Sequence, residues 1–436
     1  MTILNEIKVL DLSNLDPNKY TVWVAGFIGA TGSNFYILQS DGSFAAPAAA
    51  TAAPFHGITS DLTINVPNVT NTGNNRLVFT VTPATTQNIA YPMNGYTAYP
   101  FQPPGIPGTC PPGPYDIFEF GPNAQYDVSA VDSFGLNLSF QVAGDLQTYG
   151  VRPSVARAQI CSAFNSFTQT DPYGPAFTQL LYSSPGSTGY PPLIDGQFSA
   201  IVSPKDWLAI HKDALGLAYY WGDTVNAFFM DGNQLAFFLN GATVGHYAGS
   251  CDGGRYTLTG PDGLTVHIPK ADFLGNQGFL QAVRPRNPGE TRAHHRTFGQ
   301  IEAALFQAFS RGVALDGVVK GGNPITPDYS SNAWTNTANW FTNHPNAYNG
   351  KPSVYDVYAR FFHFGTVGGQ TIYGRNSSGK FAMAYGFSLD ENPNVGSTTL
   401  KIPTNSWPNG MNVPSKPLQT VGSQTVTLTI GPWGAS

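Results

Sequence analysis

The chain is poor in cysteine and in charge. Its 436 residues include three cysteines, Cys110, Cys161 and Cys251, which allow at most one internal disulfide and leave one thiol over. Only 11% of the residues are charged, and 21 Lys plus Arg against 26 Asp plus Glu give a formal net charge of −5. Proteins that bind nucleic acids usually carry a basic patch. The composition therefore argues against a nucleic-acid partner and leaves neutral polymers as candidates.

Long apolar runs are also missing. No segment approaches the roughly 18–20 apolar residues that a transmembrane helix requires, so we expect no membrane partner. The first residues, Met1 to Glu6, do not begin like a secretory signal, because no basic start leads into an apolar core.

The usual signatures of several enzyme classes are absent from the sequence. It has no GxSxG elbow, no P-loop and no GxGxxG, so acyl transfer and nucleotide binding lack support. His294 and His295 are adjacent and diverge on a helix or strand, and neither HExxH nor paired CxxC accompanies them. We therefore expect no catalytic metal and no cofactor.

Glycine, proline and aromatic residues are plentiful, with 48 Gly, 35 Pro and 13% aromatics. This composition is typical of a turn-rich β protein. Short strands between turns are predicted over the first 150 residues. The character changes to mixed α/β after about residue 150, with helices predicted at 155–167, 207–220 and 297–312, and strands are predicted again from about residue 355. The fold class expected is therefore mainly β (α+β).

Two acids, Glu119 and Asp132, are placed on what the pattern predicts to be neighbouring strands. Side chains alternate along residues 117–120, so Glu119 should point away from the Phe residues on either side. Residues 121–125 are predicted to be a turn, and a hairpin centred between Gln125 and Tyr126 would pair position 119 with position 132. Two carboxylates on one face are the minimal machinery for glycosidic hydrolysis. The alternative is two solvated acids on a sheet surface.

Several sequence blocks resemble thaumatin-like proteins. In chain order they are YTVW at 20–23, FEF at 118–120, YDVSAVDSFGLNL at 126–138, YARFFH at 358–363 and AYGFSLDE at 384–391. Thaumatin-like chains are, however, about half this length and dense in disulfides. The chain is more similar to glycoside hydrolase family 64, the β-1,3-glucanases that join a thaumatin-like barrel to a large mixed α/β domain.

The family carries an EF…VDxxGLP block and a later YAxxxHE…YxFxYDD block, and this chain departs from both. Asn137 stands in place of the proline, Phe364 in place of the glutamate after the histidine, and Leu389 in place of the aromatic residue before the acidic pair. These changes put the substrate preference in doubt more than the catalytic pair.

The resemblance implies a fold and an activity. We expect a thaumatin-like β barrel or sandwich from residues 1–148 and 350–436, a mixed α/β domain inserted at 149–349, and a wide groove between them. The activity implied is endo-type, inverting hydrolysis of β-1,3-glucan such as laminarin or curdlan, with Glu119 as general acid and Asp132 as general base. The resemblance also implies secretion, and we expect a monomer. The alternatives are a non-catalytic glucan-binding protein and, less favoured, a structural or pore-forming surface protein.

Candidate substrate-binding residues follow from the chemistry of sugars, which stack on aromatic rings and form hydrogen bonds with amides and carboxylates. Most aromatic residues of this kind fill the core instead, and turn chemistry explains an asparagine at position 123 equally well. Residues 332–349 are the most loop-like segment and therefore supply the two tryptophans. The candidates are Asn123, Tyr126, Asp127, Ser129, Phe134, Trp334, Trp340, Asp390 and Glu391.

Overall fold

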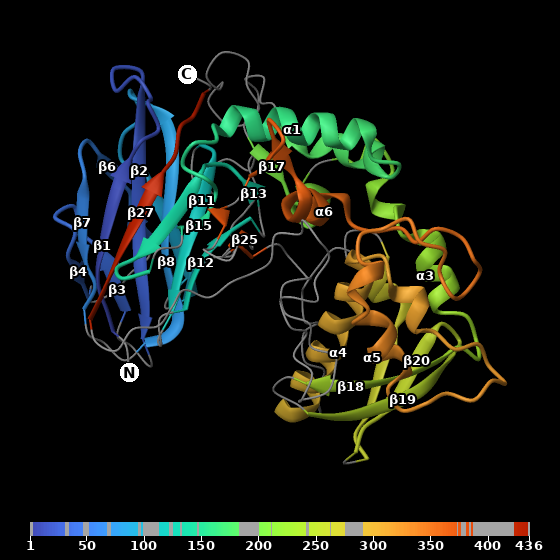
Figure 1. The fold of residues 1–436 in the computed structure, drawn as a ribbon. Helices are drawn as coiled ribbons and strands as arrows, with labels where there is room; N and C mark the ends of the chain where they lie inside the picture. The colour runs from blue at the N-terminus through green and yellow to red at the C-terminus, as the bar shows by residue number, and fades with distance from the viewer. Residues whose placement is uncertain are drawn as a thin grey trace.

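The structure is built mostly of β-strands, with helices gathered in one part of the molecule (Figure 1). Several sheets are present, and within the described residues none closes into a barrel. The expected barrel or sandwich is therefore a sandwich. The computed structural model describes residues 3–30, 35–46, 52–67, 71–94, 97–98, 113–121, 125–130, 133–145, 148–182, 200–210, 212–240, 244–261, 263–274, 291–372, 374–375, 381–382, 385–386 and 423–434.

The larger sheet of the sandwich carries the predicted site. It has eight strands, and β6 (His56–Ile58) pairs with β2 beside the main path. The order of the other strands is β26 (Tyr385–Gly386), β12 (Gln125–Ser129), β11 (Tyr115–Gly121), β8 (Asn71–Pro83), β2 (Tyr20–Ala30), β3 (Phe35–Leu38) and β4 (Phe44–Ala45).

The second sheet joins the two ends of the chain. Its C-terminal strand β27 runs parallel to β1 and antiparallel to β14, so it lies in the middle of a sheet whose other strands come from the first 150 residues. Its order is β15 (Thr148–Gly150), β14 (Leu138–Val142), β27 (Ser423–Ile430), β1 (Ile3–Asp11) and β7 (Leu62–Asn65). The domain boundaries at 148/149 and 349/350 stay predictions.

A shared core holds the two sheets together. Phe118 and Tyr126 of the larger sheet contact Phe140 of the smaller one, with ring centroids 5.2 Å and 6.0 Å apart. The Tyr126 hydroxyl also donates a hydrogen bond to Gln424 Oε1 at 2.8 Å. These aromatic contacts add to the apolar area that the sandwich buries.

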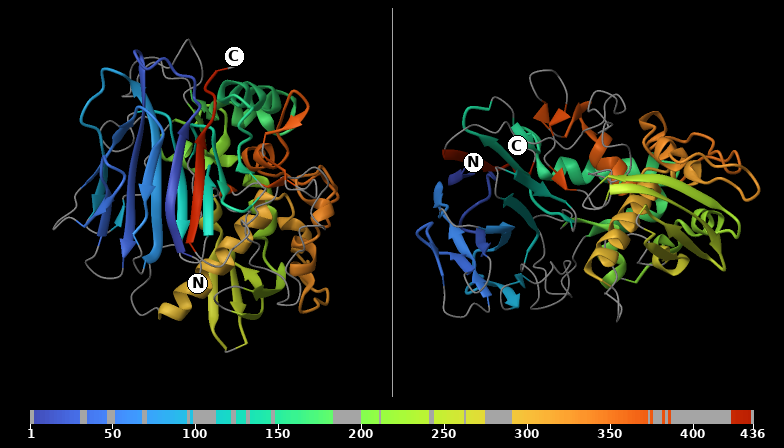
Figure 2. Two further views of the ribbon diagram at one scale, coloured as in Figure 1. Left: turned by 60° about the vertical axis from the view of Figure 1, so that its left-hand side comes forward. Right: turned by 90° about the horizontal axis from the view of Figure 1, so that it is seen from below.

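The helix-containing part lies to one side of the sandwich, and α1 extends from one part toward the other (Figures 1 and 2). A four-stranded antiparallel meander and most helices form this part. The meander consists of β18 (Gln234–Asn240), β19 (Val244–Asp252), β20 (Arg255–Thr259) and β21 (Thr265–Pro269). The α-helices are α1 (Arg157–Thr170), α2 (Pro204–Ile210), α3 (Gly222–Phe228), α4 (Arg292–Ser310), α5 (Tyr329–Trp334) and α6 (Val357–Phe364).

The remaining strands and the 3₁₀ helices are short. Three-residue and shorter strands are β5 (Ala52–Pro54), β10 (Thr97–Ala98), β13 (Ser133–Phe134), β16 (Leu181–Tyr182), β17 (Ala200–Val202), β22 (Thr366–Val367), β23 (Gln370–Thr371), β24 (Gly374–Arg375) and β25 (Phe381–Ala382), and β9 (Ala90–Asn94) is longer. The 3₁₀ helices are η1 (Gly174–Leu180), η3 (Leu217–Tyr219), η4 (Lys270–Phe273), η6 (Ala314–Gly317) and η7 (Thr337–Asn339).

Two of the secondary-structure predictions need correction. The helix predicted at 207–220 ends at Ile210, and η3 is a separate short turn that begins after Gly216, which has a positive φ of 80°. The return to strands, predicted from about residue 355, begins only at β22, because α6 comes first and Asp356 caps it by accepting hydrogen bonds from the Tyr358 and Ala359 N–H groups. The helices predicted near α1 and α4 are confirmed. None of the helices in the described part has the length and apolarity needed to cross a membrane.

A buried carboxylate fixes β11 against the chain that follows β12. Asp116 is 1% exposed, and its Oδ2 accepts hydrogen bonds from the N–H groups of Gly135 and Leu136, both at 3.1 Å. Burial raises the pKa of Asp116, whereas these N–H groups and the nearby charge of Arg157 act in the opposite direction. The Arg157 Nε donates to the Gly135 carbonyl, and its guanidinium lies 4.4 Å from the Trp433 ring centroid. Asp116 therefore links a strand, a turn and α1.

We predict that Asp116→Ala lowers the free energy of unfolding by about 3 kcal/mol or more, because buried N–H groups lose their acceptor and Arg157 loses its nearby carboxylate. Chemical denaturation monitored by circular dichroism measures the change. The matched control is Asp61→Ala, which removes an exposed carboxylate and should change stability by less than about 0.5 kcal/mol. A loss below about 1 kcal/mol for Asp116→Ala would contradict the role given to this carboxylate.

Candidate functional site

Glu119 occupies the position that the sequence pattern predicts. It lies on β11 between Phe118 and Phe120, which are 0% and 3% exposed in the sandwich core. Glu119 itself is half-buried on the opposite face of the strand. The alternation along residues 117–120 is thus confirmed, and it leaves one carboxylate accessible from solvent.

The structure adds a partner for Glu119 that the sequence analysis did not identify. Strand β8 places Arg76 directly opposite Glu119, and the Arg76 Nε donates to Glu119 Oε1 at 2.6 Å. About a third of each side chain is exposed, 29% for Arg76 and 34% for Glu119. A guanidinium at this distance stabilises the ionised carboxylate through a charge-assisted hydrogen bond. The pairing could not be seen in sequence because the two residues lie 43 positions apart.

The register predicted for the hairpin is wrong. The β11–β12 ladder pairs Glu119 with Asp127, and it closes with Gly121 opposite Gln125. Residues 121 and 125, predicted to be in the turn, therefore belong to the strands, and the hairpin is centred earlier in the chain than expected. Residues directly opposite each other in an antiparallel ladder share a face of the sheet. Position 127, not position 132, is thus the direct neighbour of Glu119.

Several predicted site residues lie outside the described residues. These are Asn123, Asp132, Asp390 and Glu391. For Asp127 and Ser129 the structure describes the backbone in β12 and not the side chain. The catalytic and substrate-binding roles assigned to these six residues stay predictions.

The four aromatic candidates are buried. Tyr126, Phe134, Trp334 and Trp340 are 5%, 0%, 1% and 1% exposed. Tyr126 and Phe134 pack inside the protein, with Phe134 5.9 Å from the Phe362 ring. A sugar stacks on a ring face that solvent can reach, so the prediction that these residues act as stacking platforms needs correction. The hydrophobic effect favours burial of these large rings in the core, as it does for most aromatic residues.

Blocks that are far apart in the sequence meet at β12. Tyr358 on α6 donates a hydrogen bond from its hydroxyl to the carbonyl of Ala130, which directly follows β12. On the other edge of the strand, Val128 and Ser129 pair with Tyr385 and Gly386 of β26 in parallel. Three of the blocks quoted above thus form one continuous unit beside Glu119.

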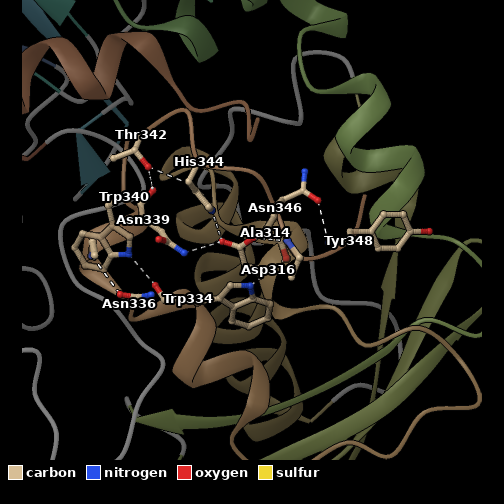
Figure 3. A network of polar contacts seen from close by, with 12 residues as sticks. Ala314, Asp316, Trp334, Asn336, Asn339, Trp340, Thr342, His344, Asn346 and Tyr348 are labelled. Atoms are coloured by element: carbon tan, nitrogen blue, oxygen red, sulfur yellow. Dashed lines mark hydrogen bonds and ion pairs between the residues drawn. The ribbon is translucent and has the colours of Figure 1, made fainter. Parts of the chain in front are cut away.

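A second group of polar residues lies in the helix-containing part (Figure 3). Asp316 on η6 is its centre and accepts a hydrogen bond from the Ala347 N–H at 3.2 Å. His344 Nε2 lies 2.6 Å from Asp316 Oδ2, and Thr342 Oγ1 lies 3.1 Å from His344 Nδ1. The segment 332–349 was predicted to be loop-like and to supply two tryptophans, whereas the His344–Asp316 pair joins residues 28 positions apart and has no signal in the local pattern.

The described residues contain no group of three or more His, Cys, Asp or Glu that could hold a metal ion. Cys161 and Cys251 are buried free thiols, and burial raises the pKa of both, to about 11 for Cys251. A thiol of this kind is a poor nucleophile at neutral pH. Glu119 is therefore the better starting point for a reaction.

Comparison with known proteins places the fold. No family model matches the sequence, and no curated protein matches it. Among solved structures, the chain is similar to a laminaripentaose-producing β-1,3-glucanase in complex with laminaritetraose, with 14% identity, 98% of each chain covered and a TM-score of 0.56. It is also similar to a β-1,3-glucanase domain (GH64) from Clostridium beijerinckii, with 13% identity, 98% of each chain covered and a TM-score of 0.52. The similarity is at the level of the fold.

We predict that Glu119→Gln changes the free energy of unfolding by less than about 1 kcal/mol, because the Arg76 ion pair is partly exposed and such pairs contribute little to stability. Thermal and chemical denaturation of the variant measure the effect. Arg76→Ala serves as the matched control and should behave in the same way. If Glu119→Gln unfolds the protein, Glu119 is a structural residue and its candidacy as a reactive group fails.

Proposed function

We propose that the protein hydrolyses β-1,3-glucan. The observation that carries this proposal is the similarity of fold to two β-1,3-glucanases over 98% of every chain compared. Glu119 supports it, because a half-exposed carboxylate lies on a strand of the larger sheet, beside the block that resembles the family signature. Fold alone does not determine function, so the argument depends on what this carboxylate can do.

The mechanism we propose is an inverting attack by water within the glucan chain. Glu119 donates a proton to the glycosidic oxygen of the leaving sugar, and Asp132 removes a proton from the water that attacks the anomeric carbon. The products are two shorter glucans, and the two carboxyl groups exchange their protonation states before the next cycle. No cofactor takes part in these steps.

The ion pair with Arg76 places a condition on this mechanism. A general acid must contact the glycosidic oxygen, whereas Glu119 Oε1 already accepts a hydrogen bond from Arg76 Nε. We propose that the bound glucan separates Arg76 from Glu119 and so frees the carboxyl group to contact the glycosidic oxygen. If the Arg76–Glu119 ion pair stays intact when glucan binds, the protein would bind glucan without cleaving it. A non-catalytic glucan-binding protein is therefore the second candidate function.

The substrate also bears on location. A protein that hydrolyses the β-1,3-glucan of another organism must act outside the cell that makes it. We propose on this ground, and on the family resemblance, that the protein is secreted. Detection of the protein in the culture supernatant of its source would test this point.

We predict that the purified protein releases soluble oligosaccharides from laminarin and curdlan, and that Glu119→Gln and Asp132→Asn each lower turnover by about 10²–10⁴-fold, the range for general acid–base groups. Product analysis after fixed times measures the rates. Release of single glucose units alone would contradict the endo-type cleavage. Binding of glucan without any release would support the non-catalytic alternative.

The leaving group of the substrate distinguishes the roles of the two carboxylates. An activated aryl leaving group needs less protonation, so it should rescue Glu119→Gln more than Asp132→Asn. Azide should rescue Asp132→Asn by replacing the water that the base activates. If the activated leaving group rescued Asp132→Asn more than Glu119→Gln, the roles of the two residues would be exchanged. Equal turnover by the unsubstituted protein and both variants would remove both residues from the mechanism.

We predict that the first product formed carries the α configuration at its new reducing end, because a single displacement at a β-linked carbon inverts it. Proton NMR during the first minutes of hydrolysis detects the anomer before mutarotation equilibrates it. A β-anomer formed first would show retention and would require a covalent intermediate in place of the water activated by Asp132.

A further inference from the structure

An open hollow lies beside the Asp316 group. It has a volume of about 450 Å³, within the range of roughly 300–1,000 Å³ that is typical of ligand sites. We call it the asparagine pocket and define it by the polar side chains that line it, which are Asp316, Thr326, Tyr329, Asn332, Asn336 and Asn339. It is built by η6, α5, η7 and the loop after them, whereas Glu119 lies on β11 of the sandwich.

Hydrogen bonds to one carboxylate hold the walls of the pocket in place. Asp316 is 6% exposed and contacts three residues between positions 339 and 347. Its oxygens accept from the Ala347 N–H at 3.2 Å and from Asn339 Nδ2 at 3.4 Å, and they lie 2.6 Å from His344 Nε2 (Figure 3). Asp316 is therefore occupied by the protein itself, and the pocket keeps its shape without a ligand.

Two buried tryptophans neighbour the pocket-lining asparagines in the chain, Trp334 at the end of α5 and Trp340 directly after η7. The Trp334 Nε1–H donates to the Ala314 carbonyl at 3.2 Å, and the Trp340 Nε1–H donates to the Trp334 carbonyl at 2.9 Å. The Arg311 guanidinium lies 3.9 Å from the Trp340 ring centroid. Large side chains fixed in this way leave the short asparagines little freedom, which lowers the entropic cost of binding.

The remaining polar groups of the pocket are available to a ligand. Within the described residues, no hydrogen bond involves the side chains of Thr326, Tyr329 and Asn332. Asn336 uses its Oδ1 as an acceptor for the Ala338 N–H, and Asn339 uses its Nδ2 as a donor to Asp316, so each keeps one end of its amide free. The pocket thus offers both donors and acceptors.

The charge of the lining selects the class of ligand. Among the described residues, neither Lys nor Arg lines the pocket, and the one carboxylate among them is already hydrogen-bonded. A phosphate or another anion would find no positive charge there, and an apolar molecule would leave several amides and hydroxyls without hydrogen bonds. A neutral molecule rich in hydroxyl groups meets both conditions.

We propose that the asparagine pocket binds a neutral sugar unit and forms a carbohydrate site separate from Glu119. Hydroxyl groups of a pyranose ring would exchange hydrogen bonds with the amides of Asn332 and Asn336 and with the Tyr329 hydroxyl. The class of ligand follows from the pocket, and the choice of β-1,3-glucan as that ligand rests on the proposed function. The site would hold a polymer chain while another part of it is cleaved.

The experiment measures binding separately from hydrolysis. Laminaritetraose, cellotetraose and maltotetraose are titrated by calorimetry into Glu119→Gln/Asp132→Asn protein, which retains the pocket and cannot turn over the sugars by the proposed route. The test protein carries Asn332→Ala and Asn336→Asp in addition. Asn332 is exposed, and aspartate at position 336 keeps the oxygen that accepts the Ala338 N–H, so both changes preserve the local fold. The control is Asn226→Ala, which removes an exposed amide on α3.

We expect the two pocket substitutions to lower the affinity for at least one of these sugars by about tenfold or more, because hydrogen bonds between the sugar and the two amides are lost. The Asn226→Ala control should leave the affinity unchanged, and circular dichroism should show all variants folded. Unchanged affinity for all three sugars in the folded pocket variant would overturn the proposal.

The same measurements separate this proposal from the proposed function. If the pocket variant loses cellotetraose or maltotetraose binding, and the protein with native Glu119 and Asp132 hydrolyses no β-1,3-glucan, the pocket is supported and the proposed reaction is refuted. If the protein with native Glu119 and Asp132 hydrolyses laminarin, and the pocket substitutions leave sugar affinity unchanged, the proposed reaction is supported and the pocket is refuted.

Discussion

The contact on which the candidate site depends is the buried carboxylate of Asp116. It joins β11, the strand that presents Glu119, to the backbone of Gly135 and Leu136, and Arg157 extends the same contact to α1. A side chain at position 135 would not fit, since an added Cβ would lie 2.3 Å from the Tyr115 carbonyl oxygen. The glycine of the signature-like block thus serves packing, three positions after Asp132, the proposed general base.

The two faces of β11 have different surroundings. Phe118 and Phe120 contribute to the core between the sheets, whereas Glu119 faces away from them and meets Arg76. The stability of the site is supplied by buried groups, and the proposed general acid, Glu119, is left partly exposed. Substitutions at the exposed positions can therefore alter chemistry with little effect on the fold.

The sequence predicted the features that follow from local periodicity. Alternation along β11, the α1 and α4 helices and the β-rich class were all accessible from the pattern of apolar residues. The hairpin register was not, because Gly121 and Gln125 look like turn residues and yet pair in the ladder. Arg76, the burial of Trp334 and Trp340, and the asparagine pocket depend on contacts between distant segments, which no local pattern encodes.

Cleavage of a glucan at Glu119 can be tested by a crystal structure of the Glu119→Gln protein with laminaripentaose. We expect a glycosidic oxygen within about 3.2 Å of the side chain of residue 119, the distance at which a proton can pass between them, with Arg76 moved away. A structure in which residue 119 still contacts Arg76 and no sugar lies beside β11 would contradict it.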